Sequence, residues 1–523
     1  MRNNISSLHK YEKVLLFFLF IFSILINQYY GNLGVSPLDS FSHFDTSFRV
    51  LNGEFPFRDF WAISGPIVDY IQAIFFFIFG INWQAYVLHA SFINGILTLT
   101  SYLVFRNFNL SVGYSFFYSF LFSILAYPTS GTPFVDHHAA FFSLLGVYFS
   151  ILAIKKENKF FWYMLPIFFG FAFLSKIVPS SYIILCLTII LLSYSYINKK
   201  FHLLKYSIFS SIIFILLLIF IFKLQGVKIS SVLIQYILHP LSVGSERVDF
   251  YSLTFKGLIF HFKFIYFALV PFFFVTIKRI IKNKNYLKHK DFYYILIILS
   301  LVFTLIVHQI LTQNQTFIFF LIPILTAFSH VSLEKLKLKK NYLKILLILL
   351  CIYSTTKYHF RFNENRKFHD LNHLDFNLVL DGSLIDNKFN GLKWISPEFP
   401  NNPKKEIRLL LKIKNLLNAD KRKKVLITNY SFFSGILDLK LNSPVRWHLT
   451  SGQTSPKLGS KYFKNYRNFY LEKLKENEIE VIYIIKPFDT NVLTGIIDEK
   501  CLQTLEIDEN INIHLIQKCN NLR

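Results

Sequence analysis

The chain has 523 residues, of which 53% are hydrophobic, 18% aromatic and only 17% charged. A water-soluble domain of this size could not bury so much apolar surface, so the composition excludes a purely soluble protein. The formal net charge is +25. It does not call for nucleic acid as a partner, because most basic residues lie between apolar segments.

Apolar segments recur until about residue 356, and many reach the roughly 17 to 25 residues that a helix needs to cross a bilayer. No small-residue cleavage site follows the first segment, so we expect it to remain as an anchor rather than a secretory signal. We predict a mainly α fold, a polytopic membrane helix bundle of the first 355 residues. About eleven membrane-spanning helices are expected, near Val14–Tyr30, Gln84–Phe105, Leu110–Tyr127, His138–Ile154, Phe160–Ser175, Val178–Ile197, Tyr206–Phe222, Gly257–Ile277, Phe292–Leu311, Thr316–Val331 and Tyr342–Thr355.

The basic residues also predict the topology. With the N-terminus inside, the inner segments hold twenty-one Lys and Arg residues and the outer loops before residue 356 hold eight, which follows the positive-inside rule. Two long outer loops, 31–83 and 223–256, are then expected. In the first, the apolar but short Gly65–Gly80 segment suits a helix lying in the membrane interface. The alternative, a twelfth crossing, would invert every later loop.

Residues 356–523 change in composition and predict a small α/β soluble domain on the outer face. Charged helical runs (Lys404–Leu417, Tyr462–Glu476) alternate with strand-like runs (Val425–Thr428, Val481–Ile485). Cys501 and Cys519 bracket two further strand-like runs that predict a hairpin, so a disulfide between them is one interpretation and two free thiols the other. The remaining cysteines fall within predicted spans and are expected to be buried thiols.

The first long loop is dense in ionisable groups between Ser36 and Pro66. Such a density beside a bilayer indicates a functional site. Asp45 and Arg49 are four residues apart and would share one face if the stretch is helical; a simple surface salt bridge is the alternative interpretation of the pair. The ionisable residues of this loop are Asp39, His43, Asp45, Arg49, Glu54, Arg58 and Asp59.

HFDTSFR (His43–Arg49), then GEFPFRDF (Gly53–Phe60) and a Gly-Pro step into the interfacial segment, resemble the first outer loop of the GT-C superfamily. That superfamily includes protein O-mannosyltransferases, lipid A aminoarabinose transferases and the catalytic subunits of oligosaccharyltransferases. The resemblance implies a membrane glycosyltransferase that takes a sugar from a polyprenyl-phosphate donor. It also implies that Asp45 is the catalytic acidic residue.

A second motif, SGTPFVDHHAAFF (Ser130–Phe142), resembles the second acidic motif of oligosaccharyltransferases, whose archaeal versions also read Asp-His-His. Asp136 and His137 are therefore candidate ligands of Mg²⁺ or Mn²⁺. A capping aspartate followed by interfacial histidines would explain the same residues without a metal. Both interpretations stay open.

Further candidates follow from the resemblance. Lys176, in AFLSKIVPS, resembles a Leu-Thr-Lys segment of bacterial members and would suit a lipid phosphate, as would Arg49 and Arg58. A snorkelling lysine is the alternative. Glu246 and Arg247, in HPLSVGSERVDF, resemble the mobile outer loop in position only and are expected to touch donor phosphate or acceptor.

Two motifs of the GT-C relatives named above are not found in this sequence. Asp45 is followed by Thr46 rather than a second acid, and no tryptophan has a tryptophan neighbour, so transfer of an oligosaccharide to asparagine is not expected. The acceptor is expected to be a lipid, a glycan or a protein, and the location a bacterial inner membrane with the N-terminus cytoplasmic. A transporter or flippase of lipid-linked glycans, or a non-catalytic assembly subunit, remain alternatives.

Overall fold

A computed structural model describes residues 10–248, 254–282, 285–312, 318–336, 342–449 and 452–517. Most of them are helical. In these ranges, nine helices are long and apolar enough to cross a membrane, which confirms the predicted polytopic helical protein. They are Tyr11–Gly31, Trp83–Asn107, Val135–Lys156, Ile177–Ile197, Phe201–Leu224, Lys263–Ile281, Lys290–Leu311, Ile318–Lys335 and Tyr342–His369.

The other two predicted spans form shorter helices. The segment near Leu110–Tyr127 folds as α6 (Val112–Leu125) with 14 residues, and the segment near Phe160–Ser175 as α8 (Lys159–Ser175) with 17. At about 1.5 Å per residue, α8 is near the lower limit for a crossing and α6 is below it. The predicted interfacial segment forms α4 (Ile67–Phe79), which is 13 residues long.

The chain forms two compact units, each assembled from three segments that are separated in the sequence. The first unit combines Met1–Asn32, Val87–Leu217 and Tyr251–Phe368, and the second combines Leu33–Tyr86, Leu218–Phe250 and His369–Arg523. The predicted division, 1–355 and 356–523, cuts the chain at one position and stays a prediction. The compact units group the first long loop with the C-terminal region.

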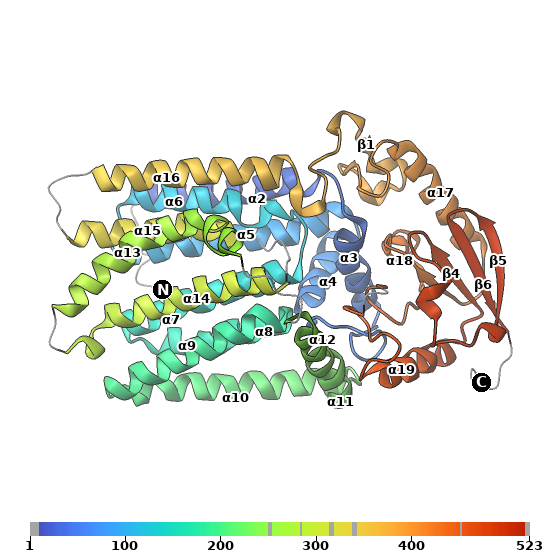
Figure 1. Cartoon of the computed structure of the whole chain (residues 1–523), viewed down its shortest axis with the longest axis horizontal. Coiled ribbons are helices and arrows are strands. Elements are labelled where there is room, and N and C mark those ends of the chain that lie inside the picture. The colour runs from blue at the N-terminus through green and yellow to red at the C-terminus, as the bar shows by residue number, and fades with distance from the viewer. Residues whose placement is uncertain are drawn as a thin grey trace. The chain divides into compact units, whose positions relative to one another are not determined.

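The first unit is a bundle of helices, which Figure 1 shows lying side by side. Its centre is α7, because every residue from Val135 to Ile154 is buried and α8, α9 and α14 pack around it. Besides α6 and α8, the helices of this unit are α2 (Lys10–Gly31), most of α5 (Trp83–Asn107), α7 (Val135–Lys156), α9 (Ile177–Ile197), most of α10 (Phe201–Leu224), α13 (Lys263–Ile281), α14 (Lys290–Thr312), α15 (Leu321–Lys335) and α16 (Tyr342–His359).

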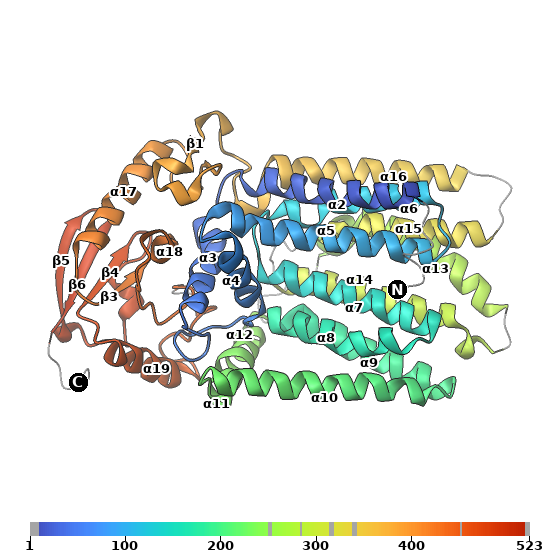
Figure 2. The same cartoon turned by 180° about the vertical axis from the view of Figure 1, so that it is seen from behind.

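The second unit contains a four-stranded sheet in the order β3-β4-β6-β5 (Figure 2), which confirms the predicted α/β region. β3 and β4 are parallel, and β5 and β6 form the predicted antiparallel hairpin. The elements are α3 (Pro37–Leu51), α4, α11 (Ile229–Val232), α12 (His239–Val248), β1 (Leu380–Asp381), β2 (Lys393–Trp394), α17 (Pro403–Ala419), β3 (Lys424–Ile427), α18 (Phe433–Leu437), α19 (Phe463–Glu476), β4 (Val481–Ile485), β5 (Leu502–Asp508) and β6 (Ile511–Ile516).

Alternate residues of β3 and β4 build the core of this sheet. Val425 pairs with Ile482 and Ile427 with Ile484, and these side chains share an apolar cluster with Tyr466 of α19. Because strand side chains alternate between faces, this cluster fixes which face of the sheet α19 covers. Trp61, from the first long loop, lies in the same cluster.

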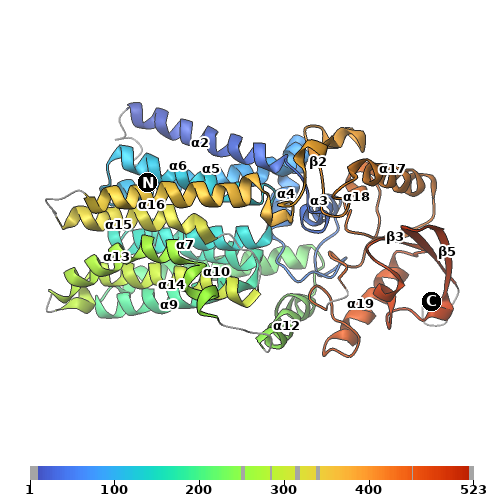
Figure 3. The same cartoon turned by 45° about the horizontal axis from the view of Figure 1, so that its top comes forward.

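Trp61 also joins the first loop to the C-terminal region through the main chain. Its N–H donates to the carbonyl of Pro444 at 2.8 Å, and its carbonyl accepts from the N–H of Arg446 at 3.1 Å. Helix α18 packs on α3, and the two can be followed in Figure 3. The loop that carries the first candidate residues and the C-terminal region therefore form one folded unit.

Candidate functional site

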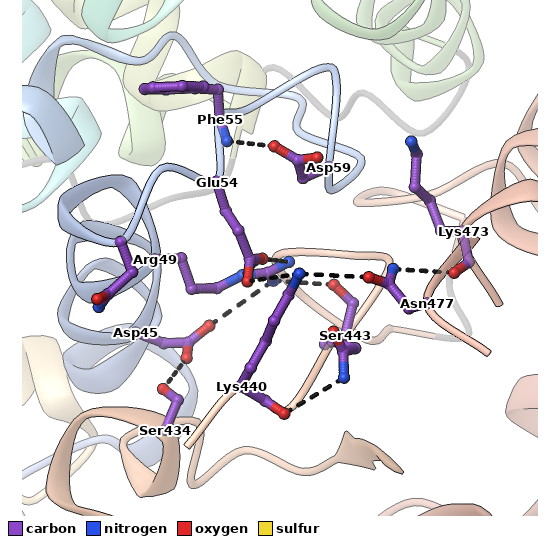
Figure 4. Close-up of polar contacts among 12 residues, drawn as sticks. Asp45, Arg49, Glu54, Phe55, Asp59, Ser434, Lys440, Ser443, Lys473 and Asn477 are labelled. Atoms are coloured by element: carbon purple, nitrogen blue, oxygen red, sulfur yellow. Dashed lines mark hydrogen bonds and ion pairs between the residues drawn. The ribbon is translucent and has the colours of Figure 1, made fainter. Parts of the chain in front are cut away.

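Helix α3 carries the predicted acidic residue. Pro37 occupies the first helical turn, where its missing N–H costs nothing, and the helix runs to Leu51. Asp45 and Arg49 lie on one face, with Oδ2 and Nη1 4.0 Å apart (Figure 4). Only 8% of Asp45 is exposed. The predicted helical pair thus exists, but it is buried rather than a surface salt bridge.

Arg49 is held by partners other than Asp45. Its Nε and Nη2 atoms donate to Oε2 of Glu54 at 2.8 and 2.6 Å, and Nη1 donates to the carbonyl of Ser443 at 2.8 Å. Burial acts to lower the pKa of Arg49, but the nearby carboxylates outweigh it and raise that pKa. The guanidinium is therefore a fixed positive charge beside Asp45.

The C-terminal region supplies the opposite side of this site. Ser434, in α18, donates a hydrogen bond to Oδ1 of Asp45. Lys440 lies with its Nζ atom 3.7 Å from Oε1 of Glu54. Ser443 Oγ contacts Nε2 of His448 at 2.8 Å. These residues could not be predicted from the sequence, because nothing in the local pattern of 431–448 indicates that it folds against α3.

These two segments enclose a cavity of about 210 Å³, here named the Asp45 cavity. All of its lining residues belong to the second unit. They are Asp45, Phe48, Arg49, Asn52, Glu54, Leu426, Thr428, Ser431, Ser434, Asp438, Leu439, Lys440, Leu441, Asn442, Ser443, Val445, Arg446 and His448.

The environment of Asp45 shifts its acidity. Burial raises the pKa of Asp45 from about 3.8 to about 6, against the opposing effects of the Arg49 charge and the Ser434 hydrogen bond. Burial and the Arg49 charge lower the pKa of His448 to about 3, so this imidazole is neutral at physiological pH. The carboxylate is thus basic enough to accept a proton near neutral pH, which is the requirement for a general base.

A second buried carboxylate, Asp69 in α4, organises the neighbouring side chains. Its Oδ1 atom contacts Nδ1 of His43 at 2.7 Å and accepts from Oγ1 of Thr46 at 2.7 Å, and Arg446 donates to Oδ2. Burial alone would raise the pKa of Asp69, but Arg446 and His43 lower it overall. Arg446 also donates to Ser64. This ion pair fixes α3, α4 and the C-terminal segment to one another.

Arg58, predicted to bind phosphate, lies on the first loop. It contacts Asp59 Oδ2 through Nη2 at 2.7 Å, and Nη1 donates to the carbonyl of Gln225 at 2.5 Å. Its side chain is about one-third exposed, at 34%. The guanidinium is thus partly engaged and partly accessible, and its role as a phosphate ligand stays a prediction.

In the first unit, the other predicted residues form an ion pair at the ends of two helices. Lys176, the residue between α8 and α9, donates from Nζ to both oxygens of Asp136, at 2.7 and 2.9 Å. Nε2 of His308 lies 3.3 Å from Oδ1 of the same carboxylate. Lys176 is 29% exposed, whereas Asp136 and His308 are buried. The two sequence candidates are partners, which their separate motifs did not predict.

The neighbouring histidines have other contacts. Nε2 of His137 lies 3.2 Å from the Thr129 hydroxyl, and His138 contacts Tyr127 and His89. The Asp136 carboxylate is occupied by an ammonium group, which suits an ion pair better than a divalent cation. Within the described ranges, no group of three or more His, Cys, Asp or Glu side chains is arranged to hold a metal ion. The Mg²⁺ or Mn²⁺ site stays a prediction, and no step below depends on it.

Two sets of candidates are only partly described. The side chains of Glu246 and Arg247 lie outside the described part of the structure, although their backbone is in α12. Cys501 is disulfide-bonded, and Cys186 and Cys351 are free thiols. Cys519 lies outside the described residues. The predicted Cys501–Cys519 pair stays a prediction.

Comparison with known proteins bears on the middle of the chain. Residues 64–224 match the family model described as dolichyl-phosphate-mannose-protein mannosyltransferase. This segment includes Asp136 and Lys176 but no residue of the Asp45 cavity. No curated protein matches the chain. Over residues 64–224 the chain is similar to this mannosyltransferase family, which confirms the resemblance to GT-C membrane glycosyltransferases.

Proposed function

We propose that the protein is a membrane glycosyltransferase that moves a sugar from a polyprenyl-phosphate donor to a hydroxyl of an acceptor. The similarity over residues 64–224 supports glycosyl transfer in general. The donor, the acceptor and the side of the membrane are part of the proposal. The excess of basic residues in the inner segments supports chemistry on the outer face, with the N-terminus cytoplasmic. A bacterial inner membrane is also part of the proposal.

One observation carries the proposal, the buried carboxylate of Asp45 in the wall of a cavity that is lined by charged, polar and apolar side chains. Burial raises its pKa to about 6. A base is most effective when its pKa lies near the working pH, because it is then ionised and still attracts a proton. A carboxylate with a structural role only would be expected in a closed ion pair, whereas Asp45 lies 4.0 Å from Arg49 and lines the cavity.

In the proposed step, Asp45 takes the proton of the acceptor hydroxyl while the hydroxyl oxygen attacks the anomeric carbon of the donor sugar. The bond between that carbon and the phosphate oxygen breaks, and its electron pair leaves with the polyprenyl phosphate. The products are the new glycoside, the lipid phosphate and a protonated Asp45, which returns its proton to solvent. Arg49 limits the rise in the pKa of Asp45 and so keeps the base ionised.

Charge also develops on the leaving phosphate, and cations would stabilise it. Lys176 is the first candidate because its ammonium is partly exposed and lies in the segment that matches the mannosyltransferase family. Asp136 would hold Lys176 in position. Arg58, whose guanidinium is partly accessible, is the second candidate. In this proposal Asp136 has a positioning role and does not contact substrate.

The test is to incubate the purified protein with labelled polyprenyl-phosphate sugars and to measure cleavage of the sugar–phosphate bond. A transferase releases or transfers the sugar and leaves free polyprenyl phosphate. A flippase or an assembly subunit leaves that bond intact. An intact donor after incubation with a panel of hexosyl and pentosyl donors would contradict the proposal.

A further inference from the structure

The Asp45 cavity has balanced charge. Its lining includes three carboxylates, of Asp45, Glu54 and Asp438, and three cations, of Arg49, Lys440 and Arg446. The formal charges therefore cancel, since His448 is neutral at physiological pH. A cavity without net charge gives no electrostatic advantage to a phosphate or to another anion.

Both arginines of the cavity already form ion pairs with carboxylates. Arg49 forms its ion pair with Glu54, with Nη2 and Oε2 2.6 Å apart. Arg446 donates to Asp69 and is almost wholly buried. Binding of an anion would have to compete with these buried pairs, which is costly because it leaves a carboxylate without its counter-charge. The cavity is thus poorly suited to the donor phosphate.

The remaining lining groups are those that bind hydroxyls. Thr428 and Ser431 provide hydroxyls, Asn52 an amide, and Asp438 and Lys440 charged groups that accept and donate. Asn52, Asp438 and Lys440 are exposed, and Asp45 is buried. Polar groups therefore extend from the protein surface to the carboxylate of Asp45, as a ligand with hydroxyls along its length would require.

The size of the cavity limits what it holds. Its volume of about 210 Å³ is below the roughly 300 to 1,000 Å³ of pockets that take drug-sized ligands. One sugar ring is a ligand of this smaller size and carries several hydroxyls. A lipid chain would need a continuous apolar lining, whereas the apolar side chains here, Phe48, Leu426, Leu439, Leu441 and Val445, share the wall with charged and polar groups.

We propose that the Asp45 cavity binds one neutral sugar residue at the end of a glycan acceptor, with the hydroxyl that is to be glycosylated facing Asp45. This inference rests on the proposed glycosyl transfer. It adds the class of acceptor and assigns its recognition to residues 426–448, which lie outside the segment that matches the mannosyltransferase family. The residues that select the acceptor then come from the C-terminal region.

The experiment compares two lysine variants of the full-length protein, Lys440→Trp and Lys421→Trp. Both lysines are exposed and belong to the C-terminal region, but only Lys440 lines the cavity. Two rates are measured with labelled donor, transfer to a glycan acceptor and hydrolysis of the donor by water without acceptor. We expect the ratio of transfer to hydrolysis to fall about a hundredfold in Lys440→Trp. Lys421→Trp keeps the wild-type ratio.

A second measurement does not depend on the folding of a variant. Methyl hexosides, a serine-containing peptide and inorganic phosphate are added in turn to the wild-type protein, and transfer to the glycan is followed. We expect inhibition by a methyl hexoside and none by the peptide or by phosphate at equal concentration.

Inhibition by the peptide alone would assign the cavity to a protein acceptor, and inhibition by phosphate alone would assign it to the donor. Either result would overturn the inference. An unchanged ratio in Lys440→Trp would overturn it as well. If the wild-type protein neither transfers nor hydrolyses the donor, the proposed function itself fails.

Discussion

The hydroxyl of Ser434 donates a hydrogen bond to the carboxylate of Asp45, although the two residues lie 389 positions apart in the sequence. A hydrogen bond to the ionised form favours that form, and here it offsets part of the rise in the pKa of Asp45 that burial causes. Through this contact the C-terminal region adjusts the basicity of the proposed base. Ser434 is therefore a positioning residue for the reaction.

Ser434→Ala removes this hydrogen bond and leaves the carboxylate in place. Hydrogen bonds to charged groups contribute about 1.5 to 3 kcal/mol, so the pKa of Asp45 should rise by about one pH unit or more. Since the ionised form is the base, the acid limb of the pH profile of kcat/KM should move to higher pH. The wild-type midpoint is expected at about pH 6. Ser434→Thr, which keeps the hydroxyl, is the control. A profile that does not move in Ser434→Ala would contradict the assignment.

Asp45 should lower the stability of the folded protein at neutral pH. Its pKa of about 6 exceeds the ordinary value of about 3.8, so the folded state binds the proton more tightly than the unfolded state. Stability therefore falls as the pH rises from about 4 to about 6, and the full cost, about 3 kcal/mol, applies above that range. Asp45→Asn removes the ionisation and should raise the unfolding temperature in detergent at pH 7.5. At pH 4 the difference from wild type should be small. A lower unfolding temperature at pH 7.5 would contradict the account.

For the buried pair of Asp69 and Arg446, removing one charge should lower the stability of the folded protein, the opposite of the effect expected for Asp45→Asn. Asp69→Asn leaves a buried guanidinium without its counter-charge, which typically costs about 3 to 5 kcal/mol. Arg446→Met alone leaves the Asp69 carboxylate buried without its counter-charge and should lower the stability by a similar amount. The double variant should lose much less than the sum of the two single losses, because both charges are then gone. Strictly additive losses in thermal unfolding would show that the two side chains do not act as a pair.

Lys176 is predicted to stabilise the leaving phosphate. Lys176→Met should reduce transfer by about two powers of ten. Lys176→Arg keeps the charge and the contact with Asp136, and it should retain more activity. Asp136→Asn is informative because it frees the lysine without removing it. If phosphate binding depends on Lys176 held by Asp136, this variant should raise the KM for the donor. Full activity of Lys176→Met would exclude the lysine from the reaction.

Long apolar segments allowed the membrane bundle to be predicted from the sequence, because a helix that crosses a bilayer must be apolar over its whole length. The predicted strand Val481–Ile485 forms β4 with the same ends. The predicted span near Leu110–Tyr127 forms only 14 helical residues as α6. Pro128 directly follows that segment, and a proline disfavours helix in the residue before it.

Only some residues of the candidate site could be predicted from the sequence. Asp45 and Arg49 could be found because their spacing and motif are local. Ser434, Ser443 and Arg446 could not, since their contacts depend on the packing of residues 431–448 against α3 and α4, nearly 400 positions earlier. The contact of Lys176 with Asp136 spans 40 positions and needs the packing of α7 and α8. Single-sequence patterns carry no information on such distant pairs.

The most direct test of the central claim measures glycosyl transfer by Asp45→Asn. The variant keeps the size of the side chain and removes the base, so transfer from a labelled polyprenyl-phosphate sugar should fall by about two to four powers of ten. Asp438→Asn, an exposed carboxylate at the mouth of the same cavity, should fall far less. Wild-type rates in correctly folded Asp45→Asn, with full cleavage of the donor, would contradict the role of Asp45 as the general base.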